Sequence, residues 1–463
     1  MRRYFVFIVL GLGLLAVSIS GTSVAVAFPH LTAELNTTLV LAGWVIGVTM
    51  FVAAVSMPVA GKISDILGRK FIFMFAVICF IVGSLISALA PNIGVLIFAR
   101  FIQGLGGGGI LPSATGIAVD EFASKRHQVV GLFSSIFAAG QIIGPNLGGW
   151  MVEAFGWRSI FWINIPLGLI VLLAGYRVIQ PSPRQPGKID VLGAGLLTVT
   201  LGTFLVAVSS LGGGGEISWV FFATLVIISA LFLIIFIRYE RSIQNPIIDL
   251  EILREKPFIA ANIYNFILGF SALGVMSFLP LYAVSVYGVS TFVSGAILTP
   301  RSIALIAAST LVSAFILKWG YRKPMLIGSI LFSISLVLLG MEPAALYIFN
   351  MAIISVAILI FILFLSGLGS GIAIPAANNA CIELMPERVS TITGIRGMFR
   401  QCGSSISIAV ISLILQTYQD NMALGFSIIF FGLAAVTIIS LPAIFFMPSS
   451  ATSSSETEFG QPT

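Results

Sequence analysis

The fold of this chain is decided by the stretch Gly61-Lys62-Ile63-Ser64-Asp65-Ile66-Leu67-Gly68-Arg69-Lys70, a compact charged turn between two long apolar segments. Each apolar flank is long enough to cross a bilayer, so the turn belongs at the water edge of a membrane. Its two glycines allow a tight backbone, and Asp65 can cap the helix that follows. Arg69 and Lys70 hold the turn on one side of the membrane. The stretch therefore predicts a hairpin of two membrane-spanning helices.

The composition of the whole chain agrees with an all-α polytopic membrane protein. Hydrophobic residues make up 58% of the 463 residues, charged residues make up 9%, and the mean hydropathy is +1.10. A soluble domain would carry about a quarter charged residues. We expect about fourteen spans of roughly 20 residues and no large soluble domain. These spans are placed near 4–28, 39–60, 71–90, 93–117, 128–151, 158–179, 190–211, 217–238, 258–280, 291–316, 323–341, 346–376, 390–416 and 422–447.

The basic residues predict the orientation of the chain. With the N-terminus inside, the cytoplasmic segments collect the lysines and arginines that lie between spans, whereas the outer loops hold only Arg158. This is the distribution of the positive-inside rule, and it predicts cytoplasmic N- and C-termini in a cell membrane. The net charge of +6 is therefore a signal of topology. It does not indicate a nucleic-acid partner, because the bases are spread over many loops.

An internal repeat predicts the domain organisation. The residues Gly104-Leu105-Gly106, Gly108, Pro112, Gly131 and Gly140 recur 263 positions later as Gly367-Leu368-Gly369, Gly371, Pro375, Gly394 and Gly403. Two repeats of six spans are the halves of a carrier whose substrate site lies between them at mid-membrane. We expect a six-helix bundle in 1–180, two additional helices in 181–256, a second six-helix bundle in 257–448 and a disordered cytoplasmic tail in 449–463.

The charged turn resembles the loop between spans two and three of the major facilitator superfamily, written Gly-x-x-x-Asp-x-x-Gly-Arg-Lys. Fourteen spans with an additional central pair resemble the drug:proton antiporter branch of that superfamily. The resemblance covers about residues 1–447 and implies a secondary active transporter, with proton-coupled efflux of drugs or other small amphipathic compounds by alternating access. It also implies a gating loop, whose residues are Gly61, Asp65, Gly68, Arg69 and Lys70.

Two further motifs resemble the same branch. The segment Gly140-Gln141-Ile142-Ile143-Gly144-Pro145-Asn146-Leu147-Gly148-Gly149 is similar to the fifth-span motif of exporters, and Arg400-Gln401-Cys402-Gly403 is similar to the thirteenth-span motif. Three glycines spaced by four residues in the fifth span form a smooth face for close helix approach. The proline weakens the helix at that face. The fifth-span motif is either a feature of exporters or a packing motif with no bearing on direction.

The first span departs from the family pattern Leu-Asp-x-Thr-x-Val-Asn-x-Ala-Leu-Pro. This pattern aligns with Ile19-Ser20-Gly21-Thr22-Ser23-Val24-Ala25-Val26-Ala27-Phe28-Pro29, so Ser20 replaces the aspartate and Ala25 the asparagine. A buried carboxylate is what an exporter of cations uses to exchange a cation for a proton. All acids lie in loops, at span ends or in the tail, and Glu34, Asp65 and Glu383 come nearest to membrane depth. Cation-for-proton exchange by this route is therefore in question.

The charges inside the spans are basic. Arg100 and Gln103 resemble the Arg-x-x-Gln-Gly motif of span four, where the arginine serves either proton coupling or structure. Arg301 follows Pro300 about ten residues into span ten, or roughly 15 Å, so it lies near the midplane at a predicted helix break. It is a candidate for substrate or coupling contacts, or for a structural role. Further polar cavity candidates are Ser20, Thr22 and Gln141. The spans thus contain arginines but no carboxylates. Export of an organic anion or neutral metabolite, through Arg301 and Arg100, is therefore an alternative of equal standing to export of cationic drugs.

Other classes of function lack their residues. The cysteines Cys79, Cys381 and Cys402 have no metal-ligand spacing, and the glycine run 104–109 lies inside a span, so it is no dinucleotide site. The chain has no ATPase phosphate loop and no mid-span acid for an embedded enzyme, so we expect no cofactor, no metal and no ATP. The predicted partners are a small-molecule substrate, protons and the lipid bilayer, and the expected state is a monomer. A non-transporting receptor derived from a carrier would keep the same motifs.

Overall fold

The structure is a computed structural model, and it describes residues 2–122, 126–181, 190–210, 219–243, 246, 256–349, 352–383, 389–447 and 449. The side chains of Asp65 and Glu383 are outside the described part of the chain, as are all of the predicted tail except Ser449 and the residues joining several helices. The described residues are helical, with short turns between helices. The predicted all-α class is confirmed.

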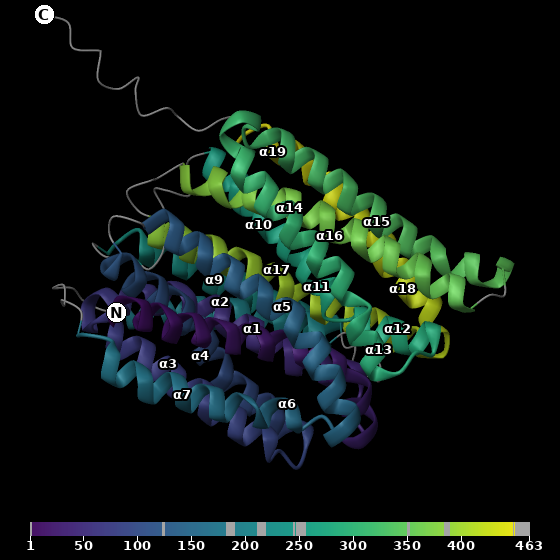
Figure 1. The fold of residues 1–463 in the computed structure, drawn as a ribbon, viewed down its shortest axis with the longest axis horizontal. Coiled ribbons are helices and arrows are strands. Elements are labelled where there is room, and N and C mark those ends of the chain that lie inside the picture. The colour runs from purple at the N-terminus through teal and green to yellow at the C-terminus, as the bar shows by residue number, and fades with distance from the viewer. Residues whose placement is uncertain are drawn as a thin grey trace, which may run out of the picture.

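The helices form two bundles and an inserted pair. The first bundle consists of α1 (Arg2–Glu34), α2 (Leu39–Leu67), α3 (Arg69–Ala88), α4 (Ile93–Glu121), α5 (Arg126–Phe155), α6 (Ser159–Trp162) and α7 (Asn164–Val178). The inserted pair consists of α8 (Val191–Ser210) and α9 (Trp219–Glu240). The second bundle consists of α10 (Lys256–Leu268), η3 (Gly269–Leu273), α11 (Gly274–Met276), α12 (Leu279–Tyr287), α13 (Thr291–Ala296), α14 (Leu298–Trp319), α15 (Arg322–Phe349), α16 (Ala352–Glu383), α17 (Val389–Thr417), η5 (Gln419–Asn421), α18 (Met422–Ile439) and α19 (Leu441–Ile444). In Figure 1 the purple and blue helices of the first bundle lie below the green helices of the second.

The span count agrees with the sequence. Thirteen helical segments among the described residues are long and apolar enough to cross a membrane, and α5 lies at the place of the fifth expected span. The helices pack alike in both bundles, since α4 contacts α2 and α3, and α16 contacts α14 and α15. In the same way, α5 packs on α1, and α17 packs on α10 and η3. The predicted pair of six-helix bundles with two inserted helices is therefore confirmed.

The glycine repeat occupies equivalent packing sites in the two bundles. A Cβ atom at Gly104 would lie 3.0 Å from the carbonyl oxygen of Thr49 on α2, and one at Gly367 would overlap with the carbonyl oxygen of Arg301 on α14. Glycine at these positions lets two helix backbones touch. The internal repeat of the sequence is thus a repeat of close helix contacts.

Replacement of Gly367 by alanine should destabilise the second bundle. The new methyl group would meet the backbone of α14, which cannot move aside as a flexible side chain would. We expect a loss of about 1–3 kcal/mol, measured as a lower unfolding temperature in detergent. Gly432→Ala is the matched control, because nothing lies within 4 Å of its added Cβ atom. Equal unfolding temperatures for the two variants would contradict the close contact.

One feature of the tenth span differs from the sequence prediction. The helix break lies at Ile297, between α13 and α14, and not at Pro300. Pro300 is the third residue of α14, where a missing backbone N–H costs no intrahelical bond. A second irregularity, the π-helix η3, interrupts the ninth span and was not predicted. The proline therefore starts a helix here, and the prediction of a break at Pro300 is wrong.

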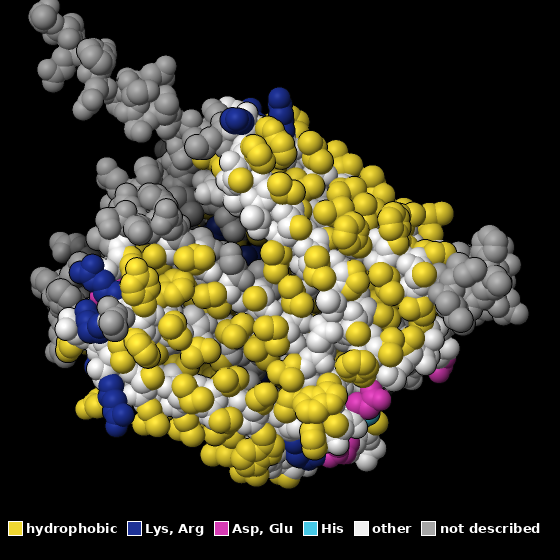
Figure 2. Space-filling model, viewed as in Figure 1, with side chains coloured by type: hydrophobic (Ala, Val, Ile, Leu, Met, Phe, Trp, Pro, Cys, Tyr) yellow, Lys and Arg dark blue, Asp and Glu magenta, His cyan; other side chains and the backbone are white. Residues whose placement is uncertain are grey.

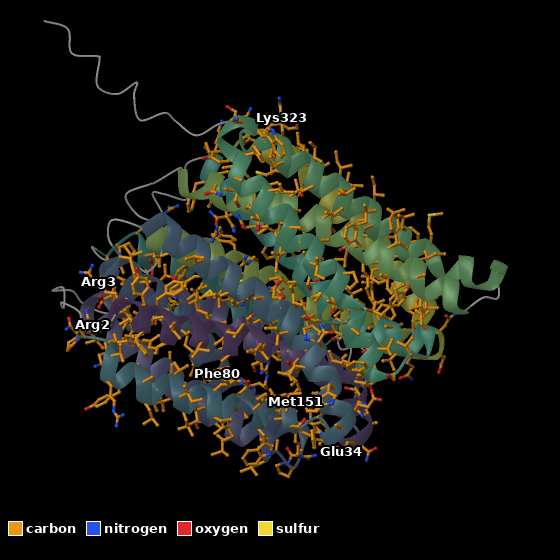
Figure 3. The ribbon with its side chains drawn as sticks, in the orientation of Figure 1. Arg2, Arg3, Glu34, Phe80, Met151 and Lys323 are labelled. Atoms are coloured by element: carbon orange, nitrogen blue, oxygen red, sulfur yellow. The ribbon has the colours of Figure 1, made fainter. Side chains whose placement is uncertain are left out.

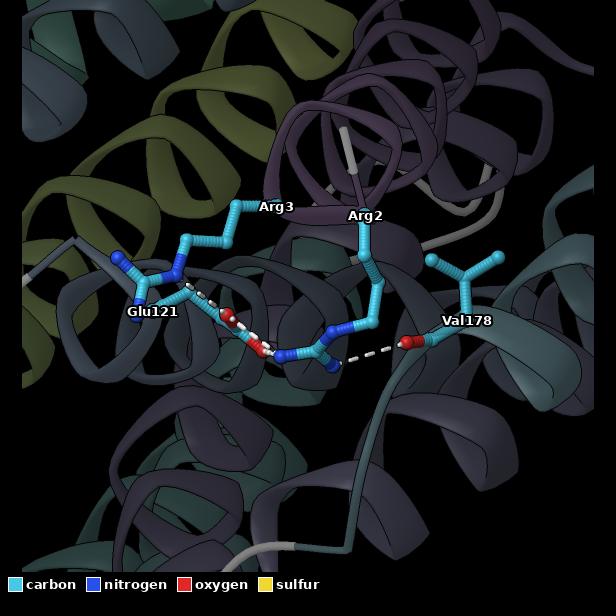
Figure 4. A network of polar contacts seen from close by, with 4 residues as sticks. All are labelled: Arg2, Arg3, Glu121 and Val178. Atoms are coloured by element: carbon cyan, nitrogen blue, oxygen red, sulfur yellow. Dashed lines mark hydrogen bonds and ion pairs between the residues drawn. The ribbon is translucent and has the colours of Figure 1, made fainter.

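The two ends of the bundles differ in charge. We call the end that holds Arg2 and Lys62 the Lys62 end, and the opposite end the Glu34 end. Figure 3 shows Arg2, Arg3 and Lys323 at one end of the molecule and Glu34 at the other. Close to Arg2, Figure 4 shows its guanidinium bonded to Glu121 at 2.7 Å and to the carbonyl oxygen of Val178 at 3.3 Å. This network ties the start of α1 to the ends of α4 and α7.

The largest apolar core shared by both bundles lies at the Glu34 end. The cluster there joins the two bundles, with the rings of Phe28 and Phe278 centred 5.2 Å apart. Towards the Lys62 end one cluster belongs to the first bundle and contains Phe73. Another cluster belongs mainly to the second bundle and the inserted pair, contains Tyr264, and includes Ala54 of α2. The space-filling view shows a hollow between the bundles, with basic side chains visible inside it (Figure 2).

Candidate transport site

The bases of the gating loop bind within the first bundle. Gly68, with a φ of 101°, is the single residue between α2 and α3. Arg69 donates to the carbonyl oxygen of Gly116 at 2.9 Å and to Asp120 at 2.6 Å, both on α4. Lys70 donates to the carbonyl oxygen of Tyr176 on α7 at 2.8 Å. Arg69 and Lys70 thus hold the loop against its own bundle, and the gating role of the loop, including Asp65, stays a prediction.

The glycines of the fifth-span motif face α1. Gly140, Gly144 and Gly148 lie against Ser18, Thr22 and Ser23, where added Cβ atoms would overlap with or crowd the α1 side chains. Ser23 donates through Oγ to the carbonyl oxygen of Gly144 at 2.9 Å. This face of α5 therefore serves close packing inside the first bundle.

A neighbouring face of the same motif touches the second bundle. A Cβ atom at Gly295 on α13 would overlap with the carbonyl oxygen of Pro145, and one at Gly149 would lie 3.0 Å from the carbonyl oxygen of Thr291. The sequence predicted one smooth face on α5, whereas the structure uses two. Residues 140–149 thus join α1 to α13 across the molecule.

Hydrogen bonds between the bundles gather at the Glu34 end. Asn146 on α5 and Thr299 on α14 are joined through Nδ2 to Oγ1 at 2.7 Å and through Oδ1 to Oγ1 at 2.9 Å. His30 Nε2 lies 2.9 Å from Thr291 Oγ1, and the carboxylate of Glu153 accepts from the backbone N–H of Phe292 at 2.9 Å. Sequence reasoning missed Thr299 and Glu153 as contact residues. Together these bonds close one end of the space between the bundles.

Breaking the Asn146–Thr299 contact should favour opening of the Glu34 end. Asn146→Ala removes a hydrogen-bonded pair worth about 1 kcal/mol, and this corresponds to a shift of about fivefold between closed and open populations. The measurement is spin-label distances across α5 and α13 in lipid nanodiscs. Thr224→Ala is the control, because Thr224 bonds only its own helix in the described structure. An unchanged distance distribution in Asn146→Ala would show that the contact does not hold this end shut.

A buried polar network occupies the place of the missing first-span aspartate. Gln103 donates through Nε2 to Ser20 at 3.1 Å and to Ser84 at 2.7 Å. Asn164, at the start of α7, donates through Nδ2 to Ser20 at 3.0 Å. Sequence reasoning missed Ser84 and Asn164. Both lie on other helices, so only the arrangement of the helices shows that they belong to this network. The hydroxyl of Ser20 thus receives two amide donors.

Arg100 joins this network and is 1% exposed. Its Nη1 bonds Gln103 Oε1, its Nε donates to the carbonyl oxygen of Val45 at 2.9 Å, and its guanidinium lies 5.7 Å from the centre of the Phe161 ring. No carboxylate among the described residues pairs with Arg100, and its buried Nη2 has no hydrogen-bond partner there. Oxygen dipoles and an aromatic face therefore stabilise a buried cation without a counter-charge.

Arg301 is a second buried arginine and lies on α14 of the second bundle. It is 4% exposed, and its one hydrogen bond to the described residues runs from Nε to Ser366 Oγ at 3.4 Å. Ser366 precedes Gly367 as Gln103 precedes Gly104, so the repeat places a polar side chain at the same position in each bundle. The two arginines are not related by the repeat, since Arg100 lies on α4 with Gln103 and Arg301 lies on α14. The remaining guanidinium nitrogens of Arg301 have no hydrogen-bond partner among the described residues. An arginine fork suits carboxylate, phosphate or polarised oxygen.

The other predicted site residues have more ordinary contacts. Thr22 donates to the carbonyl oxygen of Ser18 at 3.0 Å within its own helix, and Gln141 is half-buried. Gly403 lies against the carbonyl oxygen of Phe266, so the thirteenth-span motif packs α17 on the ninth span. Gln401 and Arg400 are half-buried beside this contact, on α17. The described residues contain no group of three or more potential metal ligands.

The comparison with protein families agrees with this geometry. The family model described as Major Facilitator Superfamily matches residues 10–348 and 266–462. The chain belongs to the major facilitator superfamily. It is 32% identical to Multidrug resistance protein 3 of Bacillus subtilis (strain 168) over 426 residues, which cover 90% of this chain and 80% of the relative.

Further relatives carry similar names. Multidrug transporter protein MdtP of Bacillus subtilis (strain 168) is 26% identical over 409 residues, covering 88% of this chain and 74% of the relative. Methylenomycin A resistance protein of Streptomyces coelicolor (strain ATCC BAA-471 / A3(2) / M145) is 28% identical over 461 residues, covering 94% and 92%. Within the superfamily, the chain thus resembles the multidrug-efflux branch, as the sequence motifs predicted.

Proposed function

We propose that this protein is a proton-coupled secondary exporter of drugs or other small amphipathic compounds, working by alternating access. The observation that carries the proposal is the pair of equivalent bundles, which share a large core at the Glu34 end and have mostly separate cores towards the Lys62 end, where α2 alone of the first bundle contributes to the second bundle's cluster. A carrier open to one side has this arrangement. The resistance functions in the names of the relatives support export.

The Lys62 end is assigned to the cytoplasm of a cell membrane, with both termini inside. Arg2, Arg3 and Lys323 lie at this end, which agrees with the positive-inside rule (Figure 3). The structure then corresponds to a carrier open to the cytoplasm, ready to receive a compound from the cell interior or the inner leaflet. We propose a monomer with domains at 1–180, 181–256 and 257–448, without cofactor or ATP.

The contacts between the bundles indicate how the two bundles would rock relative to each other during transport. α2 and α17 are in contact near both ends, where Gly43 meets Ser412 and Gly394 meets Pro58. α5 touches α13 and the start of α14 near the Glu34 end through Asn146 and its neighbours. Rocking about the α2–α17 seam would therefore break the α5 contacts and open the Glu34 end. The gating loop would close the other side.

The substrate class has a second candidate. Arg301 is a buried cation with unmatched guanidinium nitrogens, and the first span carries Ser20 in place of an acid. Both features favour an anionic or neutral compound over a cationic drug. Export of an organic anion or neutral metabolite is therefore the alternative function. A receptor that has lost transport would bind such a compound without moving it.

The deciding experiment uses sealed inverted vesicles with an imposed pH gradient. A lipophilic cationic dye, an organic anion and a neutral lipophile are added in turn. Loss of the gradient on addition of the dye would support drug:proton antiport, and loss with the anion alone would support the Arg301 alternative. Binding of a compound without any transport or gradient change would contradict both exporter proposals.

A further inference from the structure

Four polar side chains on one face of α17 have buried atoms without a partner. After Arg396, the residues Arg400, Ser404 and Ser407 follow at intervals of four, four and three positions, so the four residues form one stripe along the helix. The atoms are Arg396 Nη1, Arg400 Nε, Ser404 Oγ and Ser407 Oγ, and none has a hydrogen-bond partner among the described residues. Buried donors are normally paired, so a whole stripe of unpaired donors needs an explanation.

The two serines of this stripe differ from other serines in the spans. Ser412, on the same helix, donates to a backbone carbonyl oxygen one turn earlier at 2.7 Å, as serines inside helices commonly do. Ser404 and Ser407 are 0% exposed, and their hydroxyls make no such bond in the described structure. A Cβ atom at Gly274 would overlap with Ser407 Oγ, so Ser407 is packed against the ninth span. Ser407 therefore ends the stripe, and Ser404 is the donor beside the arginines.

Arg396 and Arg400 are neighbours of like charge. They lie one helical turn apart on the same face, where their guanidinium groups repel each other. No ion pair in the described part of the chain includes either arginine, although the buried acids Asp190 and Glu240 stand at the ends of helices that pair beside α17. Two cations held this close inside a membrane protein are stabilised by an anion.

The stripe begins near the Lys62 end and runs inward. α17 starts at that end, where Gly394 meets Pro58 of α2. At 1.5 Å per residue, Arg396 lies about 10 Å and Ser404 about 22 Å along the helix from its start. α17 contacts α2, α8, α10 and α16, so helices surround it. Arg396 and Arg400 are half-buried, and their exposed parts are thus directed to the space that these helices enclose.

An aromatic surface lies beside the donors. Phe266 and Phe270 contact α17 at Gly403, which stands between Arg400 and Ser404 in the chain. The two rings stack with their centres 6.4 Å apart, and both residues are half-buried. Charged donors next to an apolar surface suit a molecule with an anionic head and an apolar body.

We propose that Arg396, Arg400 and Ser404 bind the anionic head of an amphipathic molecule, a carboxylate, phosphate or sulfonate, on the Lys62 side of the space between the bundles. The inference rests on the proposed exporter function, for which it names a subsite where an anionic compound would bind first. The guanidinium groups and the Ser404 hydroxyl donate to the oxygens of such a head. The headgroup of an anionic lipid has the same chemistry, so the experiment has to separate the two sources.

The test measures binding by native mass spectrometry of the whole protein in a neutral detergent. The probes are phosphatidylglycerol, phosphatidylcholine with the same acyl chains, decyl phosphate and decanol. We expect the protein to retain at least one anionic probe more strongly than the probe of the same tail without net charge. Phosphatidylglycerol that decyl phosphate does not displace would support the site with a lipid headgroup as its ligand. Displacement by decyl phosphate would support it with a soluble amphipathic anion as its ligand.

The arginine variants give the largest expected change in binding. Arg396→Gln and Arg400→Gln should each lower retention of the anionic probe about tenfold, because each removes a charge-assisted hydrogen bond. Arg322→Gln is the matched control and should bind as the parent protein does. Arg322 is half-buried at the same end, and its Nε donates to a backbone carbonyl oxygen at 2.9 Å.

Two further readouts do not depend on the arginine variants being folded. Ser404→Ala should lower retention about threefold, whereas Ser113→Ala should not, because the buried Ser113 hydroxyl bonds its own helix at 2.6 Å. In the parent protein, added sodium chloride should weaken binding of decyl phosphate and leave binding of decanol unchanged, since salt screens charge.

Three results would overturn the site. The first is equal retention of charged and uncharged probes by the parent protein. The second is parent-like binding of both anionic probes in Arg396→Gln and Arg400→Gln. The third is the same salt dependence for decyl phosphate and decanol. Loss of the pH gradient with the cationic dye in the vesicle assay would then still support the exporter, so the two proposals fail separately.

Discussion

Replacing Arg301 by alanine is expected to lower transport about a hundredfold, with the largest loss for anionic compounds. The guanidinium is buried in the membrane-spanning part of the chain and has one weak hydrogen bond to the described residues, so its binding capacity is left for a ligand. A charge-assisted hydrogen bond to a substrate contributes about 1.5–3 kcal/mol, and the upper value corresponds to about a hundredfold in binding. The measurement is uptake of an organic anion into inverted vesicles, compared at equal amounts of protein.

Two variants separate a substrate role of Arg301 from a structural one. Arg301→Lys keeps the charge but loses the planar fork, so it should retain part of the transport of small anions. Ser366→Ala removes the one described hydrogen bond of Arg301 and should leave transport within a few fold of the parent protein. Normal turnover per molecule in Arg301→Ala, with only less protein in the membrane, would show that the arginine is structural.

The fold could be predicted because its signals are local. The charged turn at residues 61–70 marks a hairpin by its own sequence, and apolar length alone places the spans. The close helix contacts of Gly104 and Gly367 could also be predicted from the nearby sequence, since glycine spacing in a span indicates close helix contact. These features depend on neighbours in sequence and on the bilayer, so a single sequence contains enough to infer them.

The candidate site could be predicted only in part, because burial depends on partners far along the chain. Arg100 and Gln103 were found from their motif, but Asn164 reaches Ser20 from a helix 144 residues later. Asp190 was set aside as a residue at a span end, and only the packing of α8, α9 and α2 buries it. Pro300 suggested a helix break at its own position, whereas the structure has the break at Ile297. A proline in the first turn is compatible with a helix start, and the sequence alone did not show where α14 begins.

Replacing Ser20 by aspartate is expected to raise the coupling of lipophilic cations to protons by about tenfold. Two amide donors, from Gln103 and Asn164, already point at the side-chain oxygen of this position at 3.1 Å and 3.0 Å. A carboxylate there would accept both bonds and would meet the positive field of Arg100, which has no acidic partner among the described residues. Such a group can hold a cation and exchange it for a proton, which serine cannot do.

The readout of Ser20→Asp is the dissipation of an imposed pH gradient by a lipophilic cationic dye in inverted vesicles. Ser20→Asn is the matched control, since it has a similar size and can accept one of the two amide bonds without carrying a charge. An increase in the aspartate variant alone would show that the charge at this position sets the substrate class. Equal dissipation in both variants would place cation coupling elsewhere in the molecule.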